Sequence, residues 1–252
     1  MYTVTHGTFR TPRGRTVELS YREDTNDYNT LRSCLDEDEY GLKDLHLSGI
    51  ALDIGAHIGG VTIALLADNP DLRVVSVEAV PPNVELLREN VARLDTVRST
   101  ILHAAAGKGQ TATVQWAFSG DEVGLHHAFI GNAVMPESNL RGSRSELVPV
   151  VTLADLVDEY GPFAFAKVDC EGCEYDFLQG PALSQVAIFR GEEHHGPLTL
   201  PGYSVTYTQP NAPRGFEAVR RERAHETFGD DVLREYFCIG DGKCPECAEV
   251  EA

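Results

Sequence analysis

The fold is decided by residues 50–60, which read IALDIGAHIGG. An apolar run ends at Ile54 in a glycine-rich turn, and the chain continues as the apolar segment 61–66, VTIALL. In open α/β sheets, a buried strand, a tight turn and a buried helix form a ligand crevice at the carboxyl ends of the strands. Glycines in the turn let a ligand approach the backbone, and the first N–H groups of the helix are free donors. The stretch predicts a Rossmann-like α/β sheet with a ligand in this crevice.

The glycine spacing distinguishes between nucleotide-like ligands. A dinucleotide fingerprint reads G-x-G-x-x-G, whereas Gly55 is followed by Gly59 and Gly60, and His57 takes the place of the middle glycine. Asp53, just before the turn, is expected to face the ligand with a negative charge, which repels a pyrophosphate and suits an ammonium group. The turn therefore favours S-adenosylmethionine (SAM) over NAD. An NAD-dependent dehydrogenase is the disfavoured alternative.

The next two predicted strands supply the rest of a nucleoside site. The strand 72–78 ends in Glu78, 19 residues after Gly59, which is the spacing at which a carboxylate binds ribose hydroxyls. The strand 99–103 runs into small residues against which an adenine can lie. A helix is expected to begin at residues 81–83. The contacts expected from this part of the chain are Glu78, Ala79, Val80, Asn83, Ala104 and Ala105.

A second group of charged residues follows a later buried strand. The strand 163–169 ends in the cluster 169–174, DCEGCE, and the strand 186–190 leads to two histidines. Parallel strands end at one edge of a sheet, so both groups are expected to border the same crevice. Side chains alternate along a strand, so Lys167 and Asp169 are expected to pair. Asp169, His194 and His195 are the candidate bases, and histidine is the more natural one near neutral pH.

Two motifs in these segments resemble a known family. Residues 52–59, LDIGAHIG, resemble the D-[IV]-G-A-N-x-G motif of the FkbM family of SAM-dependent methyltransferases, with His57 in place of the asparagine. Residues 167–174, KVDCEGCE, are similar to that family's K-[IV]-D-x-E-G-x-E signature. Comparable residues also stand at 39–40, 77–78 and 151–156, and the likeness covers about residues 30–195.

The resemblance implies a class I methyltransferase fold, a seven-stranded mixed sheet with its last strand antiparallel and helices on both faces. It also implies transfer of the SAM methyl group, most often to a hydroxyl of a sugar or natural product. The expected cofactor-binding residues are Glu39, Tyr40, Asp53, Gly55, Ala56, His57, Ile58, Gly59, Asp169 and the nucleoside contacts named above. The expected catalytic residues are Asp169, His194, Lys167 and Glu171.

The roles within the catalytic set are hypotheses. Asp169 and Glu171 are expected to hold the acceptor or the methionine end of SAM, and His194 or His195 to take the proton. A catalytic metal at Asp169 and Glu171 lacks a further ligand pattern, so no metal is expected. The alternatives that stay open are N-methylation, methylation of a protein or RNA on the same fold, and a non-catalytic zinc-bearing interaction protein.

The chain divides into three expected parts. Residues 1–30 suit a polar hairpin extension, residues 31–240 a methyltransferase domain, and residues 241–252 a cysteine-bearing tail. Helices are expected over 31–47 and 215–225, and a closing strand over 234–239. The loop 119–146 is long enough to be a lid or an acceptor-binding loop. Its polar candidates are His126, His127, Asn132, Asn139, Arg141 and Arg144.

Composition limits the partners and the compartment. The 252 residues carry a formal net charge of −18, which argues against a nucleic-acid partner because phosphate binding needs a basic face. No apolar run approaches the roughly 18 residues of a membrane span, and no signal-peptide pattern opens the chain, so a cytoplasmic protein with a small-molecule substrate is expected. The six cysteines are then expected to be reduced, Cys34 buried, and a zinc ion at Cys238, Cys244 and Cys247 is the less favoured reading.

Overall fold

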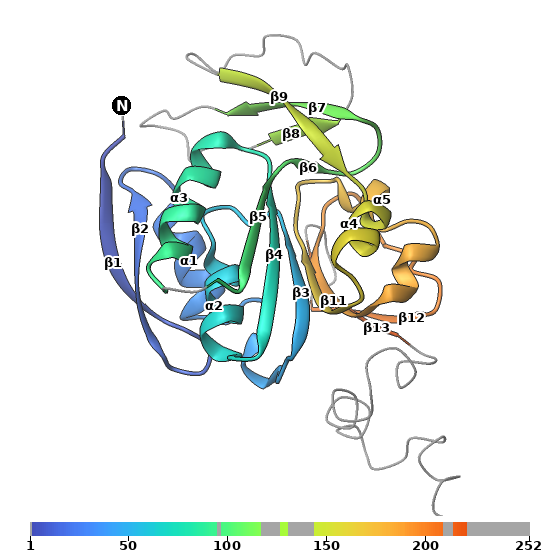
Figure 1. Ribbon diagram of the computed structural model, residues 1–252, viewed down its shortest axis with the longest axis horizontal. Helices are drawn as coiled ribbons and strands as arrows, with labels where there is room; N and C mark the ends of the chain where they lie inside the picture. The colour runs from blue at the N-terminus through green and yellow to red at the C-terminus, as the bar shows by residue number, and fades with distance from the viewer. Residues whose placement is uncertain (1, 95–96, 117–126, 131–143, 209–213, 221–252) are drawn as a thin grey trace, which may run out of the picture.

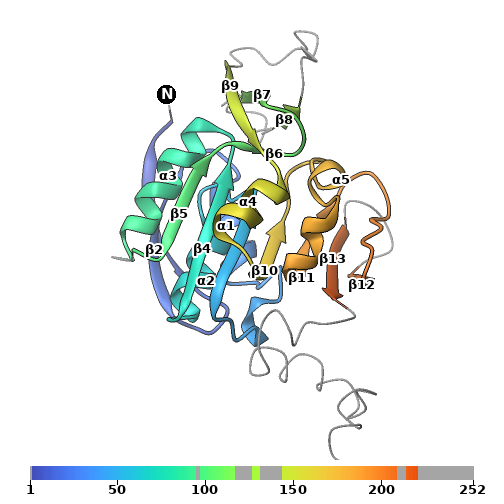
Figure 2. The same ribbon diagram turned by 45° about the vertical axis from the view of Figure 1, so that its right-hand side comes forward.

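The computed structural model describes residues 2–94, 97–116, 127–130, 144–208 and 214–220. Its centre is a seven-stranded mixed sheet (Figures 1 and 2). The strands, in spatial order, are β12 (Tyr203–Tyr207), β13 (Arg214–Arg220), β11 (Val186–Glu193), β10 (Phe163–Val168), β3 (Gly49–Ile54), β4 (Leu72–Glu78) and β5 (Ser99–His103). Strand β13 runs antiparallel to both of its neighbours, and the other adjacent pairs are parallel. The predicted fold class is confirmed.

Helices cover both faces of this sheet because its central strands are buried on both sides. The helices are α1 (Asp27–Leu35), α2 (Gly60–Asp68), α3 (Pro81–Ala92), α4 (Leu153–Tyr160) and α5 (Glu174–Phe177), with short 3-10 turns η1 (Leu42–Asp44) and η2 (Pro181–Gln185). Neighbouring residues Ala51 and Leu52 of β3 belong to different core clusters, one under α1, α2 and α3, the other under α4 and α5. Continuous apolar strands of this kind are typical of parallel sheets.

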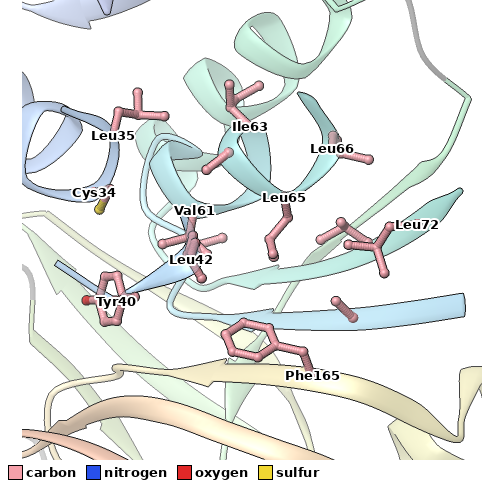
Figure 3. Close-up of a cluster of buried hydrophobic side chains, with 14 of the residues drawn as sticks. Cys34, Leu35, Tyr40, Leu42, Val61, Ile63, Leu65, Leu66, Leu72 and Phe165 are labelled. Carbon is pink, nitrogen blue, oxygen red and sulfur yellow. The ribbon is translucent and has the colours of Figure 1, made fainter. Parts of the chain in front are cut away.

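Helix α2 is the most deeply buried helix of the fold. Its side chain Leu65 points towards Phe165 of β10 and Leu66 lies beside Leu72 of β4, while Ile63 lies on the opposite side of the helix (Figure 3). Eight of its nine residues are buried, and its one charged residue, Asp68, ends the helix, where its carboxylate accepts the hydroxyl of Thr11. A helix that is apolar all round needs covering on every side, so α2 anchors the glycine turn that precedes it.

The N-terminal hairpin forms as expected. Strands β1 (Val4–Arg10) and β2 (Thr16–Arg22) pair antiparallel. Their side chains Phe9 and Leu19 join the core cluster that contains α1, α2 and α3, and the hairpin lies beside α1 and α3 (Figure 1). The hairpin thus extends the core on one face of the main sheet.

A second sheet lies beyond the end of β5. It consists of β6 (Ala105–Ala106), β9 (Arg144–Val151), β7 (Thr111–Trp116) and β8 (His127–Ile130), in that spatial order. Its buried residues, Val114, Trp116 and Val148 among them, pack with Ala79 and Val80 at the end of β4. A capping box at Thr152 and Asp155 then starts α4, as the sequence predicted.

Two predicted helices are wrong. The helix expected over 31–47 begins earlier, at Asp27, and ends at Leu35, because Asp38 and Gly41 adopt positive φ and the Asp38 carboxylate accepts the N–H groups that start η1. The helix expected from Gly215 is strand β13, whose alternate residues Phe216 and Ala218 are buried against the sheet.

Several expectations fall outside the described residues. The strand expected over 234–239 and the tail cysteines Cys238, Cys244 and Cys247 lie there. So do most of the loop 119–146 and its candidates His126, Asn132, Asn139 and Arg141, whereas His127 begins β8 and Arg144 begins β9. No helix among the described residues is long and apolar enough to cross a membrane.

Candidate active site

A cavity of about 290 Å³ opens where β3, β4, β5 and β10 end. We call it the donor cavity. The lining residues that the sequence analysis names as site residues are Gly55, His57, Glu78, Ala79, Val80, Asn83, Ala104, Ala105, Asp169 and Glu171. Sequence reasoning missed Asn26, Thr30, Val77, Ala106, Cys170 and Cys173. Asn26 stands at the N-cap position of α1, and its side chain makes no capping hydrogen bond to the helix.

The glycine turn is held in a conformation that only small or special residues adopt. Gly55 has φ of 71°, and a Cβ there would collide with the backbone oxygen of Asp169. Gly59 caps α2 with φ of 103°. His57 has φ of 51°, a region that Asn, Asp and His tolerate better than other residues. This explains why histidine can stand where the family motif has asparagine.

Glu78 is oriented into the donor cavity by hydrogen bonds to both of its oxygens. Its Oε2 accepts the N–H of His57 at 2.8 Å, and its Oε1 accepts the N–H of Val80 at 2.8 Å and Nδ2 of Asn83 at 3.3 Å. Burial raises the pKa of Glu78 although these donors oppose the rise. Its position at the end of β4 agrees with the predicted ribose contact.

Asp53 does not face the donor cavity, which corrects the sequence-based expectation. It is fully buried, its Oδ2 accepts the hydroxyl of Thr62 at 2.6 Å, and its Oδ1 lies 3.7 Å from Nζ of Lys167. Burial raises the pKa of Asp53, and Lys167 opposes that rise. The reason is the strand's alternation: Asp53 points into the sheet's α2 side, while the turn that follows reaches the cavity.

Other members of the predicted cofactor set also lie outside the cavity lining. Ala56 and Ile58 are buried beneath the turn, at 3% and 0% exposure, and Gly59 begins α2. Glu39 and Tyr40 line a different cavity, described below. The glycine turn therefore lines the donor cavity through Gly55 and His57, and not through these side chains.

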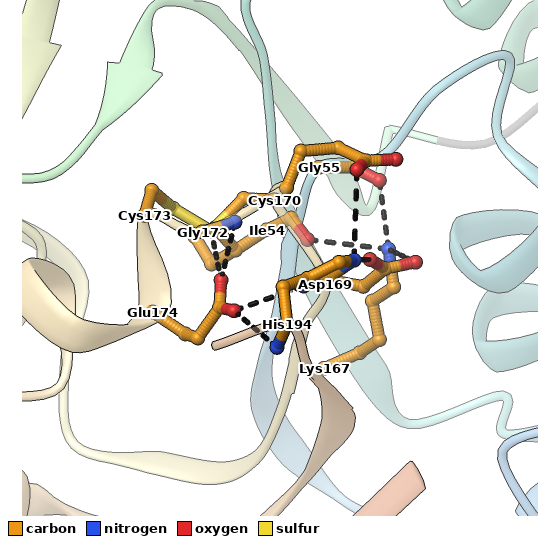
Figure 4. The surroundings of a disulfide bond; sticks show 10 residues. Ile54, Gly55, Lys167, Asp169, Cys170, Gly172, Cys173, Glu174 and His194 are labelled. Carbon is orange, nitrogen blue, oxygen red and sulfur yellow. Dashed lines mark hydrogen bonds and ion pairs between the residues drawn. A yellow bond between two sulfur atoms is a disulfide. The ribbon is translucent and has the colours of Figure 1, made fainter. Parts of the chain in front are cut away.

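Lys167 connects the glycine turn to the signature segment (Figure 4). Its Nζ donates to the carbonyl oxygens of Ile54 at 3.2 Å and Gly55 at 2.7 Å, and lies 3.8 Å from Oδ2 of Asp169. The predicted pairing of Lys167 with Asp169 is confirmed. Burial alone would lower the pKa of Lys167, but Asp169 and Asp53 outweigh it and raise the pKa.

Asp169 is fixed from a second side by Tyr40, whose hydroxyl donates to Oδ2 at 2.7 Å. Tyr40 itself is buried, and the Nζ of Lys167 lies 5.4 Å from its ring centroid. One hydrogen bond from Tyr40 and one ion pair with Lys167 thus hold Oδ2 of Asp169, and the remaining oxygen, Oδ1, faces His194.

His194 lies at the centre of a carboxylate group because β11 continues three residues beyond its predicted end. Its Nδ1 is 2.9 Å from Oε1 of the fully buried Glu174. Its Nε2 faces Asp169 Oδ1 at 3.8 Å, Glu171 Oε2 at 3.6 Å and Glu192 Oε2 at 3.8 Å. We call Asp169, Glu171, Glu192 and His194 the acidic cluster. Sequence reasoning missed Glu192 and Glu174.

The surroundings of the acidic cluster raise the pKa values of His194 and Glu192. The hydrogen bond to Glu174, aided by Asp169 and Glu171, raises the pKa of His194 to about 9. Burial and the nearby Asp169 raise the pKa of Glu192 to about 7. His194 therefore carries a proton at neutral pH. His195, the other candidate base, stacks on Tyr175, and neither of these two histidines is among the lining residues of the donor cavity.

The signature segment contains a disulfide, contrary to the expectation that all cysteines are reduced. Cys170 and Cys173 are joined, with Cα atoms 5.4 Å apart. Glu171 and Gly172 both have positive φ, which folds the segment back so that the two thiols meet. Both cysteines line the donor cavity. Cys34 is free and buried, as predicted, and burial raises the pKa of its thiol.

A second cavity, of about 530 Å³, lies on the other side of the acidic cluster. Its lining residues are Asp38, Glu39, Tyr40, Gly41, Asp44, Arg190, Gly191, Glu192, Thr206, Tyr207, Thr208, Gly215, Phe216 and Glu217. We call it the second cavity. The charge of Arg190 is taken up by Glu217, whose Oε2 accepts Nε at 2.6 Å, so the net charge of the lining is negative.

Residues 53–200, more than half of the chain, match the model of the methyltransferase FkbM domain. The chain belongs to the FkbM methyltransferase family. It is therefore a methyltransferase whose methyl donor is SAM, and both motifs quoted above fall inside the matched segment. The comparison with curated proteins found no match to this chain.

Solved structures similar to this FkbM methyltransferase are distant from it in sequence. A putative methyltransferase, yhhF, from Escherichia coli has a TM-score of 0.49 at 13% identity, covering 86% of this chain and 99% of that one. A precorrin-6y C5,15-methyltransferase from Geobacter metallireducens GS-15 has a TM-score of 0.42 at 13% identity, covering 75% and 89%. An rRNA methylase from Streptococcus thermophilus has a TM-score of 0.42 at 9% identity, covering 76% and 98%.

Proposed function

We propose that this methyltransferase transfers the SAM methyl group to a hydroxyl oxygen of a small molecule of the sugar or natural-product type. The supporting observation is the position of the acidic cluster between the two cavities. Asp169 and Glu171 line the donor cavity, while Glu192 lines the second cavity. An acceptor in the second cavity would therefore meet proton-accepting groups where it approaches the donor.

In this proposal SAM occupies the donor cavity. Its adenine lies against the small residues Ala79, Ala104 and Ala105, and its ribose hydroxyls bind Glu78, as carboxylates at this position do in related sheets. The methionine end then extends past Gly55 towards Asp169. This placement directs the methyl group at the acidic cluster and the second cavity.

The chemistry requires alignment and a proton acceptor. Methyl transfer from SAM is a displacement with a good leaving group already in place, so the protein mainly has to hold donor and acceptor in line. A hydroxyl is a weak nucleophile, and a positioned base assists it. Because His194 is already protonated at neutral pH, we assign the proton to Asp169 or Glu171, with Lys167 and Tyr40 orienting Asp169.

The volume and charge of the second cavity distinguish between the possible methyl acceptors. Its volume falls within the usual range for small-molecule sites. Its carboxylates, Asp38, Glu39 and Asp44 among them, disfavour RNA, in line with the net charge of −18. They also suit a cationic amine, and this observation makes N-methylation of an amine the second candidate.

The experiment is an acceptor screen with isotopically methyl-labelled SAM. Hydroxylated sugars and natural products form one arm, amines with the same skeletons a second arm, and RNA a third. We expect labelled ether products from the first arm. Labelled methylamines with no ether would replace the proposal by the second candidate, and labelled RNA would overturn both.

A further inference from the structure

Three members of the acidic cluster, Asp169, Glu192 and His194, bring their ligand atoms close to one another, and Glu171 lies beside them. Nε2 of His194 lies 3.6 to 3.8 Å from one oxygen each of Asp169, Glu171 and Glu192. One ligand atom from each of Asp169, Glu192 and His194 falls within 4.8 Å of the other two. Ligand atoms that are each roughly 2.0 to 2.3 Å from a common ion are spaced in this way.

The imidazole is oriented as a metal-binding histidine is. Its Nδ1 is held by Glu174, a carboxylate with no solvent exposure, and the same Glu174 oxygen accepts the N–H of His194 at 3.0 Å. The other oxygen of Glu174 accepts the N–H of Gly172 at 2.9 Å. A carboxylate behind the distal nitrogen fixes the ring and its tautomer in most metal sites, and it leaves Nε2 directed at Asp169, Glu171 and Glu192.

The cluster has three carboxylates but only one positive charge of its own, the imidazolium of His194. In the part of the chain that the structure describes, His194 is the ion-pair partner of both Glu171 and Glu192. Lys167 is shared between Asp169 and the buried Asp53. The partly buried Asp169 and Glu192 and the half-exposed Glu171 around one imidazole therefore leave room, electrostatically and geometrically, for a divalent cation in place of the imidazole proton.

We propose that Asp169, Glu192 and His194 bind a divalent cation at the boundary between the donor cavity and the second cavity, where the cation replaces the Nε2 proton that His194 carries in the metal-free protein. The donor set of two carboxylates and one imidazole suits a cation of the Mn²⁺ or Mg²⁺ type. Glu171, whose side chain is half exposed, stays beside the ion as a free carboxylate. The sequence offered no third ligand beside Asp169 and Glu171, because Glu192 and His194 reach this point only through the extension of β11.

The role of the ion in catalysis rests on the proposed function. The acceptor hydroxyl oxygen binds the cation, which lowers the pKa of that hydroxyl. The O–H bond then breaks and its proton passes to Glu171. The new O–C bond forms as the S–C bond of SAM breaks, and the bonding pair remains on sulfur in S-adenosylhomocysteine.

The test measures Mn²⁺ binding to the full-length, EDTA-treated protein by titration calorimetry and by the loss of the free Mn²⁺ signal in electron paramagnetic resonance. We expect one saturable site in the wild type. Glu192→Gln should weaken it by at least about tenfold. Glu174→Gln, which removes the charge behind the imidazole, should weaken it by roughly 10- to 100-fold. Asp158→Asn, which removes an exposed carboxylate of α4, should bind Mn²⁺ as the wild type does, and retained SAM binding shows that each variant is folded.

Each outcome decides the proposal independently of the acceptor. No saturable Mn²⁺ site, or a site that Glu192→Gln leaves unchanged, overturns the cation site, even if EDTA-treated enzyme still methylates a hydroxyl and the proposed function stands. A site that is lost with Glu192 supports the proposal, even if the acceptor screen finds no ether product. The failure of one is thus distinguishable from the failure of the other.

Discussion

The two halves of the site, the donor cavity and the acidic cluster, consist of different kinds of residues. The donor cavity consists largely of backbone and small apolar side chains, with Glu78 as its one carboxylate on the β4 side. The acidic cluster consists of charged side chains brought together by the turn after β10 and the end of β11. The first half can bind a cofactor without titrating, whereas the second half depends on protonation and charge. We therefore expect binding of SAM and methyl transfer to depend on different residues.

The substitution with the largest expected effect is Asp169→Asn, which keeps the shape of the side chain but removes its charge. We expect kcat to fall by about 10²- to 10⁴-fold, the usual contribution of a positioned acid–base group, while the Kd for SAM stays near its wild-type value. Asp158→Asn on the exposed face of α4 is the matched control. A rise in the SAM Kd as large as the fall in kcat would mean that Asp169 belongs to the donor half.

Asp53 lies beneath both halves and should affect both. Asp53→Asn removes one partner of the buried Lys167, and breaking a buried ion pair in this way costs about 3 kcal/mol or more. We expect the free energy of unfolding, measured in urea, to fall by that amount, with weaker SAM binding and slower turnover together. Asp71→Asn, an exposed carboxylate before β4, should change none of these, and an unaltered unfolding curve for Asp53→Asn would contradict the role of Lys167 as a buried connector.

Glu78→Gln tests whether the donor cavity contributes to SAM binding alone. Loss of charge-assisted hydrogen bonds costs about 1.5 to 3 kcal/mol, so we expect the SAM Kd to rise by roughly 10- to 100-fold, with kcat at saturating SAM changed little. Glu85→Gln, exposed on α3, is the control. If kcat at saturation falls more than the affinity does, Glu78 acts on the chemistry, and the two halves are not separate.

The smallest effect is a pH dependence confined to the acidic cluster. The pKa of His194 is raised from 6.5 to about 9, so its stabilisation is fully present below pH 6.5 and is lost as the pH rises through 9. In protein freed of divalent cations, we expect the free energy of unfolding to fall across this window by at most about 1.4 kcal/mol per pH unit. His194→Gln should flatten the curve and His46→Gln, an exposed histidine, should not; equal curves for all three proteins would contradict the assignment.

The same contrast explains what the sequence could predict. The glycine turn and β4 through Glu78 were predictable because apolar periodicity and fixed spacing specify strand ends and backbone turns. The acidic cluster was predicted in part: Lys167 lies in β10 and Asp169 directly follows that strand, so their pairing follows from the alternation of side chains. Glu192 and Glu174 were missed because their roles depend on contacts between β11 and the turn after β10, and no local pattern records such contacts.

Two errors have a clear physical origin. The orientation of Asp53 was mispredicted because the residue before a glycine turn can point to either face of the sheet, and pairing with Lys167 and Thr62 decides the direction. The disulfide was missed because compartment arguments say nothing about two thiols that a left-handed turn at Glu171 and Gly172 brings together.

The most direct test of the separation between the two halves is a calorimetric titration of three proteins with SAM, and of the wild type with NAD. We predict that the wild type and Asp169→Asn bind SAM with similar affinity, that Glu78→Gln binds it far more weakly, and that NAD does not bind. Equal SAM affinity in the wild type and Glu78→Gln, or binding of NAD, would contradict the placement of the methyl donor on which the rest depends.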